Sequence, residues 1–215
     1  MNRIAHTALV LAIASIMPAA SRAADPAFEA YERGELAAAL DAFVRRAERG
    51  EAVAQYNVAV IRLQDESRAV PLPTALRYLR DSARQGFARA QHLLGTLHER
   101  GRHVEPSQSL ALRWFERAAA QGLVEAQVAA GTQHYLGRGT PRDYAQAARW
   151  YEQAAGGGDV AAQYLIASMY EQGLGVAIDL RQALAWYAAA ARQGDAVARL
   201  KARSIADELA RERPS

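Results

Sequence analysis

The fold is decided by the stretch at residues 158–196, which reads GDVAAQYLIASMYEQGLGVAIDLRQALAWYAAAARQGDA. Its first residue, Gly158, belongs to a series of glycines spaced 36 residues apart, and an alanine follows each of them four residues later. In the first four copies a glutamine comes directly after that alanine. A fixed period of this length indicates a repeat array rather than a single globular core. The repeat glycines are Gly50, Gly86, Gly122, Gly158 and Gly194.

Tryptophan recurs in the same register. A Trp followed by a second aromatic residue stands 28 residues after three of the repeat glycines, and these are the only three Trp in the chain. We interpret the Trp residues as repeat-to-repeat packing, in which each buries a large face and its N–H finds a local partner. The pairs are Trp114-Phe115, Trp150-Tyr151 and Trp186-Tyr187, with Tyr78-Leu79 in the first copy.

Each copy is predicted to form two helices. The first begins about two residues after the repeat glycine and carries small or apolar residues at helical spacing. A mid-repeat glycine ends it, and Ser107, Asp143 or Asp179 caps the start of the second helix. The predicted pairs are 52–64 with 72–84, 88–100 with 107–120, 124–136 with 143–155, and 160–172 with 179–192. A degenerate pair at 28–33 and 36–49 precedes them, and a single closing helix at about 195–211 follows.

The fourth copy carries a family pattern: Ala162-Gln163-Tyr164, Ala167, Tyr170, Gly173, Gly175-Val176, Asp179, Ala183, Trp186-Tyr187, Ala190-Ala191 and Gly194. On these residues the chain resembles the Sel-like repeat family over about residues 30–200. The resemblance implies an all-α fold, a right-handed α-solenoid of antiparallel helix pairs that forms a single domain over residues 24–215. Its repeats are expected at about 50–85, 86–121, 122–157 and 158–193, with a cap at 194–211. We therefore assign Gly86, Gly122, Gly158, Gly194, Trp114, Trp150 and Trp186 to the scaffold.

Residues 1–23 have the pattern of a cleaved secretory signal peptide. Arg3 provides a positive start, an apolar run covers Ala8 to Met17, and small residues surround Ala23. The run is shorter than the roughly 20 residues that span a bilayer. The chain has no Cys, which excludes disulfides and thiolate metal sites. We expect a soluble periplasmic or secreted protein without stable membrane insertion; an uncleaved anchor or a buried helix is the alternative.

Charge argues against a nucleic-acid partner. Removal of Arg3 and Arg22 with the signal peptide reduces the 26 basic residues to 24, against 23 acidic residues. Charges alternate in sign along the helices, and no basic stripe interleaved with aromatic residues occurs. A mixed, solvated surface is expected instead.

The sequence offers no catalytic motif. Lys201 is the only lysine, so the Ser-x-x-Lys motif of penicillin-recognising enzymes and the Gly-Lys-Ser/Thr of phosphate-binding loops are both absent. His98 and His134 share one repeat position, and a metal site there is conceivable. Because the family has Tyr at this position, we interpret both as structural. No catalytic residue, metal or cofactor is predicted.

Candidate binding residues lie on the face of each first helix opposite its core stripe. Counted from the repeat glycine, this face holds positions 3, 6, 10 and 13. In a solenoid we expect it to line a concave groove, where Tyr side chains with polar tips suit a peptide. A plain solvated face is the alternative for any one of them. The candidates are Tyr56, Arg89, His92, Thr96, Glu99, Tyr135, Tyr164 and Ser168.

The resemblance implies a non-enzymatic scaffold or adaptor that binds a partner protein or peptide. It also implies an alternative, since some Cys-rich relatives are described as β-lactamases or penicillin binders. That alternative is disfavoured here because both the cysteines and the Ser-x-x-Lys motif are missing. A third possibility is a subunit of a larger assembly that makes contact through a flank.

Overall fold

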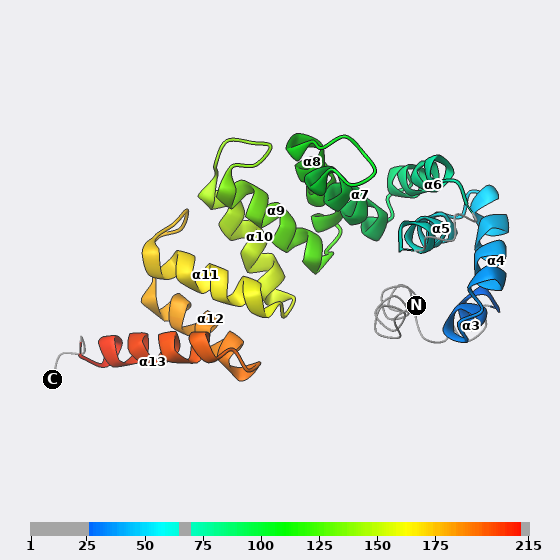
Figure 1. Ribbon diagram of the computed structural model, residues 1–215. Coiled ribbons are helices and arrows are strands. Elements are labelled where there is room, and N and C mark those ends of the chain that lie inside the picture. Colours follow the sequence, from blue (N-terminus) through cyan, green and yellow to red (C-terminus); the bar gives the residue numbers. More distant parts are fainter. Residues whose placement is uncertain (1–25, 65–69, 212–215) are drawn as a thin grey trace. The chain divides into compact units, whose positions relative to one another are not determined.

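The computed structural model describes residues 26–64 and 70–211, so the predicted signal peptide lies outside the described residues. Within these ranges all regular structure is helical, which confirms the all-α repeat fold (Figure 1). The predicted helix ends agree with the observed ones to within two residues. The helices are α3 Pro26–Glu32, α4 Leu36–Glu48, α5 Ala52–Gln64, α6 Leu72–Arg84, α7 Ala88–Arg100, α8 Gln108–Ala119, α9 Val124–Leu136, α10 Tyr144–Gly156, α11 Val160–Gln172, α12 Leu180–Arg192 and α13 Ala196–Arg211.

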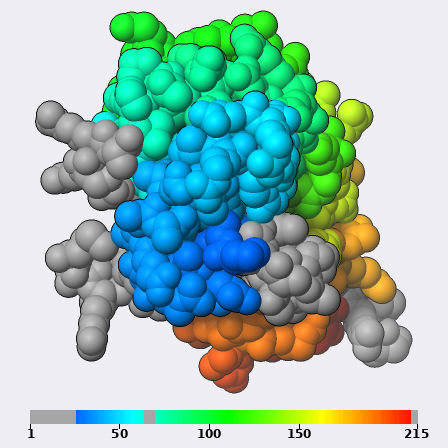
Figure 2. Space-filling view, turned by 90° about the vertical axis from the view of Figure 1, so that its right-hand side faces the viewer, coloured from blue at the N-terminus to red at the C-terminus, as the bar shows by residue number. Residues whose placement is uncertain are grey.

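The chain divides into two compact units, one up to Ala90 and one from Gln91 onward. In the first unit, the degenerate pair α3 and α4 packs through Phe28 and Phe43, whose rings meet edge to face at 5.3 Å. Both rings are buried. In the space-filling view these two helices (blue) face the viewer (Figure 2). The degenerate pair is thus a packed first layer of the array.

In the second unit each helix from α8 to α13 packs against the next helix in the chain, as expected of a solenoid. The predicted N-caps are present. Ser107, Asp143 and Asp179 each accept a hydrogen bond from a backbone N–H in the first turn of the following helix. These caps fix where the second helix of each repeat begins.

Within a repeat, the two helices approach closely because a small residue faces an aromatic ring. A Cβ added at Gly131 in α9 would lie 2.8 Å from the ring of Tyr151 in α10. A Cβ at Gly95 in α7 would lie 2.5 Å from the ring of Phe115 in α8. The ring therefore rests directly on the backbone of the first helix.

The second aromatic residue of each pair, rather than the Trp, occupies the core. Phe115, Tyr151 and Tyr187 are at most 2% exposed, whereas the three Trp are half-buried. The indole N–H of Trp186 is buried and has no partner among the described residues. The expected local partner for this N–H is therefore not found.

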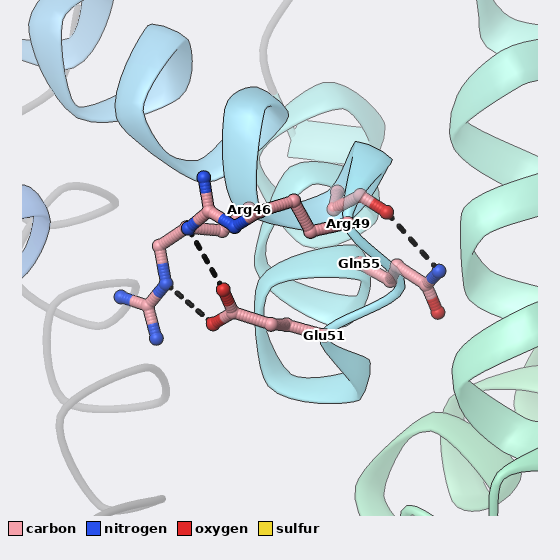
Figure 3. Close-up of polar contacts among 5 residues, drawn as sticks. Arg46, Arg49, Glu51 and Gln55 are labelled. Atoms are coloured by element: carbon pink, nitrogen blue, oxygen red, sulfur yellow. Dashed lines mark hydrogen bonds and ion pairs between the residues drawn. The ribbon is translucent and has the colours of Figure 1, made fainter.

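Between repeats, the recurring glutamine ties the first helix to the end of the preceding second helix. Gln55, Gln127 and Gln163 donate from Nε2 to the carbonyls of Ala47, Ala119 and Ala155 at 3.2–3.3 Å. Figure 3 shows Gln55 beside the Arg46–Glu51 and Arg49–Glu51 ion pairs at the α4–α5 turn.

A second glutamine, directly before the next repeat glycine at the closing position of a repeat, adds another hydrogen bond. Gln85, Gln121 and Gln193 donate to the Oε1 atoms of Gln55, Gln91 and Gln163 at 2.7–3.0 Å. In the third copy, where Gly157 takes the closing position, Gln153 accepts from Gln127 instead. The recurring glutamine is thus a structural element of the repeat.

Replacement of Gln163 by Met should lower the free energy of unfolding by about 1–3 kcal/mol, because it leaves the buried carbonyl of Ala155 and the amide of Gln193 without this partner. Urea unfolding followed by circular dichroism measures the change. The same substitution at exposed Gln182 in α12 is the matched control and should stay within about 0.5 kcal/mol of the parent. Equal effects at both sites would contradict this role for Gln163.

Two Gly→Ala substitutions should change the free energy of unfolding in opposite directions. Gly131→Ala places a methyl group against the ring of buried Tyr151, and overpacking costs about 1–3 kcal/mol. Gly156→Ala, at the end of α10, meets nothing within 4 Å, so it should stabilise the helix by about 0.5–1 kcal/mol. Thermal unfolding of both variants tests the pair. A stabilised Gly131→Ala variant would contradict the close helix approach.

Candidate functional site

The first-helix face, defined as repeat positions 3, 6, 10 and 13, is mostly half-buried. It was expected to be exposed, on the side of the helix opposite the core. Its residues lie on the buried aromatic ring of the second helix in the same repeat. His92 lies over Phe115 with ring centroids 5.5 Å apart, and Tyr164 meets Tyr187 edge to face at 5.2 Å. The second helix therefore supports the face from behind.

In helix α13 the same face has no second helix from the described residues packed behind it, and its side chains are more exposed. Val197 and Leu200 occupy positions 3 and 6 of this last copy and are 56% and 70% exposed. No second helix follows α13 in the described part of the chain to cover them. The exposed surface of α13 is therefore partly apolar.

The first copy departs from the prediction. Tyr56 is only 8% exposed and meets Phe87 edge to face at 5.2 Å. The second-aromatic position of this copy is Leu79, and Phe87, directly after the next repeat glycine, covers Tyr56 instead. Tyr56 is therefore part of the core and offers no exposed surface to a partner. Arg89, at the start of α7, is half-buried.

The predicted residues of α7 are held by local hydrogen bonds. The hydroxyl of Thr96 donates to the carbonyl of His92 at 3.1 Å. The carboxylate of Glu99 accepts from Nε2 of Gln133 in α9 at 2.7 Å. Glu99 thus links two successive first helices.

In α9 and α10 the structure assembles a cluster of three tyrosines. Tyr135 meets Tyr144 edge to face at 5.1 Å and lies 6.5 Å from the ring of Tyr151. Arg142 stands over the ring of Tyr144 at 5.7 Å. The hydroxyl of Tyr151 lies 3.1 Å from that of Thr132. The ring of Tyr135 is therefore fixed in place by its neighbours.

In α11 the face ends in an ion pair that the sequence did not reveal. Tyr187 donates its hydroxyl to Glu171 at 2.7 Å, and Lys201 of α13 donates to the same carboxylate at 2.8 Å. Ser168 accepts a hydrogen bond from Gln172 at 2.6 Å. Glu171 falls at position 13 of this face, whereas no periodic signal marks Lys201, because its helix belongs to the next copy.

These contacts shift the titration of the groups involved. Burial by itself raises the pKa of Glu171, but the hydrogen bonds from Lys201 and Tyr187 outweigh it and lower that pKa below its usual value. The hydrogen bond from Glu171 is the main cause that raises the pKa of Lys201. Burial, followed by the bond to Glu171, raises the pKa of Tyr187.

Because the pKa of Glu171 is lower in the folded than in the unfolded chain, its contribution to stability is present at neutral pH and is lost as the pH falls through the folded-state pKa. The Glu171→Gln variant should therefore melt below the parent at pH 7, and the difference should shrink below about pH 4.5. Melting curves across this range measure it. A difference that stays constant down to pH 3 would contradict the ion pair.

Two tyrosines of this face, Tyr135 and Tyr164, keep part of their surface exposed. Both rings are half-buried. Within the described residues, neither hydroxyl makes a hydrogen bond. Each therefore presents a fixed aromatic edge and a polar tip that is available to another molecule.

The two histidines on the core stripe make structural contacts. Nε2 of buried His134 lies 2.9 Å from Glu116 of the preceding second helix. Tyr170 makes the same contact one repeat later, with its hydroxyl 3.0 Å from Glu152. This recurrence supports the interpretation that His replaces Tyr at this position. Nδ1 of His98 lies 3.0 Å from the carbonyl of Glu105.

Residues 26–64 and 70–211 contain no group of three or more His, Cys, Asp or Glu residues placed to hold a metal ion. Nor does any helix there have the length and apolar character needed to cross a membrane.

The Sel1 repeat pattern matches residues 52–87, 88–123, 124–159 and 160–195. The chain therefore belongs to the Sel1 repeat family. Proteins of this family generally serve as scaffolds for protein–protein interactions and are generally not enzymes. No curated protein matches the sequence.

Solved structures agree with this family. The chain is similar to c5321, a protective antigen of uropathogenic Escherichia coli that displays an SLR fold, with 31% identity and a TM-score of 0.69 over 74% of this chain and 34% of the antigen. It is also similar to a Sel1 repeat protein from Oxalobacter formigenes, with 30% identity and a TM-score of 0.70 over 78% of this chain and 49% of that protein. The chain spans half or less of the length of these two proteins.

Proposed function

We propose that the chain is an exported, non-enzymatic scaffold that binds a segment of a partner protein on the first-helix face of α9 and α11. The observation that carries the proposal is the pair Tyr135 and Tyr164, which stand on successive first helices with half-exposed rings and available hydroxyls. Tyr is enriched at the energetic centres of interfaces because it combines contact area with a hydrogen-bonding tip.

The aromatic rings that pack against Tyr135 and Tyr164 also favour binding, because they hold both side chains in place. Tyr135 is held by Tyr144 and Tyr151, and Tyr164 by Tyr187. A side chain that is already ordered loses little conformational freedom when a partner binds. The polar groups beside them, Thr132 and Ser168, can contact the backbone of an extended segment.

Export is the second part of the proposal. It is supported by the charged start, the apolar run and the small residues at positions 1–23. The expected mature chain begins at residue 24 and acts in the periplasm or outside the cell.

Crosslinking followed by capture of the tagged full chain from the periplasm tests both parts. The Tyr135→Ala/Tyr164→Ala double variant should lose about tenfold or more of the crosslinked partner, because it removes both exposed rings. Tyr170→Ala is the matched control, since this tyrosine lies on α11 but contacts Glu152 instead of the first-helix face. It should retain the partner.

Two results would contradict the proposal. Equal capture by the double variant and the parent, with unchanged circular dichroism, would remove the first-helix face from binding. Recovery of the chain only in the cytosol, with residues 1–23 still attached, would exclude export.

A further inference from the structure

A hollow of about 330 Å³ opens between the last two helices of the second unit. Arg181 and Leu184 of α12 line one side, and Ala206, Leu209 and Ala210 of α13 line the other. Apart from Arg181 the lining is apolar. None of these residues belongs to the first-helix face, so the hollow is a separate surface.

The internal repeat shows what kind of group fills this place. One repeat earlier, Leu184, Ala206 and Ala210 correspond to Ala148, Tyr170 and Leu174. Ala148 belongs to the hydrophobic cluster of α10 and α11, and Tyr170, Leu174 and Trp186 pack against that cluster. The hollow thus lies where, one repeat earlier, the chain carries the larger side chains of Tyr170 and Leu174 in place of Ala206 and Ala210.

Another regular repeat does not fit on α13. The position where earlier copies carry Ala59, Gly95, Gly131 and Ala167 is Arg203 in this helix. At Gly95 and Gly131 the small residue admits the second aromatic ring of the following helix. The long side chain of Arg203 excludes that contact, so the expected occupant inserts a single aromatic group rather than a Trp-Tyr pair.

A second copy of this chain does not supply such a group from its first helix pair. The second helix of that pair, α4, has Phe43 at the second aromatic position, and this ring is fully buried. The Trp position before it is Ala42. The first helix pair of a second copy therefore offers no aromatic side chain to the hollow.

Charge around the hollow defines the partner further. Arg181, Arg199 and Arg203 are exposed and make no ion pair within the described residues. On α13, Arg199, Arg203, Ala206 and Ala210 are spaced by four, three and four residues, which places them on one stripe. Asp207 lies at the edge of this stripe, and Glu208 lies on the opposite side of the helix. The hollow is therefore apolar with a basic rim.

We propose that this C-terminal hollow binds an acidic amphipathic helix of a partner protein, which inserts one aromatic side chain between α12 and α13. Arg203 and Arg199 lie about 8 and 14 Å along α13 from the middle of the hollow, at 1.5 Å per residue. The partner helix accordingly carries carboxylates about one and a half to two and a half turns from its aromatic residue. This surface acts independently of the first-helix face.

The probe is a fluorescein-labelled, alanine-based helical peptide of about 16 residues, with one Trp and glutamates about one and a half and two and a half turns after it. Fluorescence anisotropy with the full chain should show saturable binding that weakens as salt is added. Replacement of the peptide's Trp by Ala should reduce affinity about tenfold or more.

Two variants of the chain test the surface itself. Ala206→Trp fills the hollow and should reduce affinity about tenfold or more by excluding the peptide's ring. Arg199→Glu/Arg203→Glu should reduce it similarly, and a peptide with Lys in place of Glu should restore binding to this variant only. The matched control is Ala38→Trp, at an exposed alanine of α4 outside both the hollow and the first-helix face, and it should bind as the parent does.

Three results would overturn the proposal. The first is equal binding of the Trp-containing and Trp-free peptides. The second is unchanged affinity of the Ala206→Trp variant with the parent's circular dichroism. The third is binding of phosphatidylglycerol-containing vesicles, lost in the double Arg variant, with no binding of the peptide; this would assign the surface to an anionic membrane instead.

Discussion

In the second and third repeats, an aromatic ring that rests on the backbone of the facing helix holds the helix pair together. The ring of Tyr151 leaves no room for a Cβ at Gly131, and Phe115 leaves none at Gly95. Such contact brings many atoms to van der Waals distance, which individually contribute little but collectively stabilise the pair. The glutamine hydrogen bonds then join one pair to the next, so the array combines apolar packing within repeats with polar bonds between them.

The same ring also shapes the surface. Its inner side supports the helix, and its edge supports His92, Thr132 or Tyr164 on the first-helix face. The residues that are free to contact a partner are therefore held by the packing contact that forms the repeat. At Arg203 of α13 this contact is interrupted, and a hollow with a basic rim lies beside it. The first-helix face depends on the contact between the aromatic ring and the facing helix. The C-terminal hollow lies where that contact is interrupted.

Much of the fold could be predicted from the sequence because the repeat is a local signal. The 36-residue period placed the helix pairs, and Ser107, Asp143 and Asp179 marked the starts of second helices where they were found to cap. The candidate site was less predictable. Helical periodicity treats every copy alike, so it placed Tyr56 on the exposed face. A single difference, Leu79 with Phe87 nearby, buries it.

The sequence by itself determined the helices, their order and the residues at which each repeat turns, because capping, helical spacing and the period act over short stretches of chain. Only the tertiary structure decided which aromatic of each pair is buried, that Lys201 reaches Glu171 from the next copy, and that a hollow opens between α12 and α13. These features depend on how far one side chain reaches across a packed interface. That distance is fixed by the volume of the neighbouring residues, and no periodic pattern along the chain encodes it.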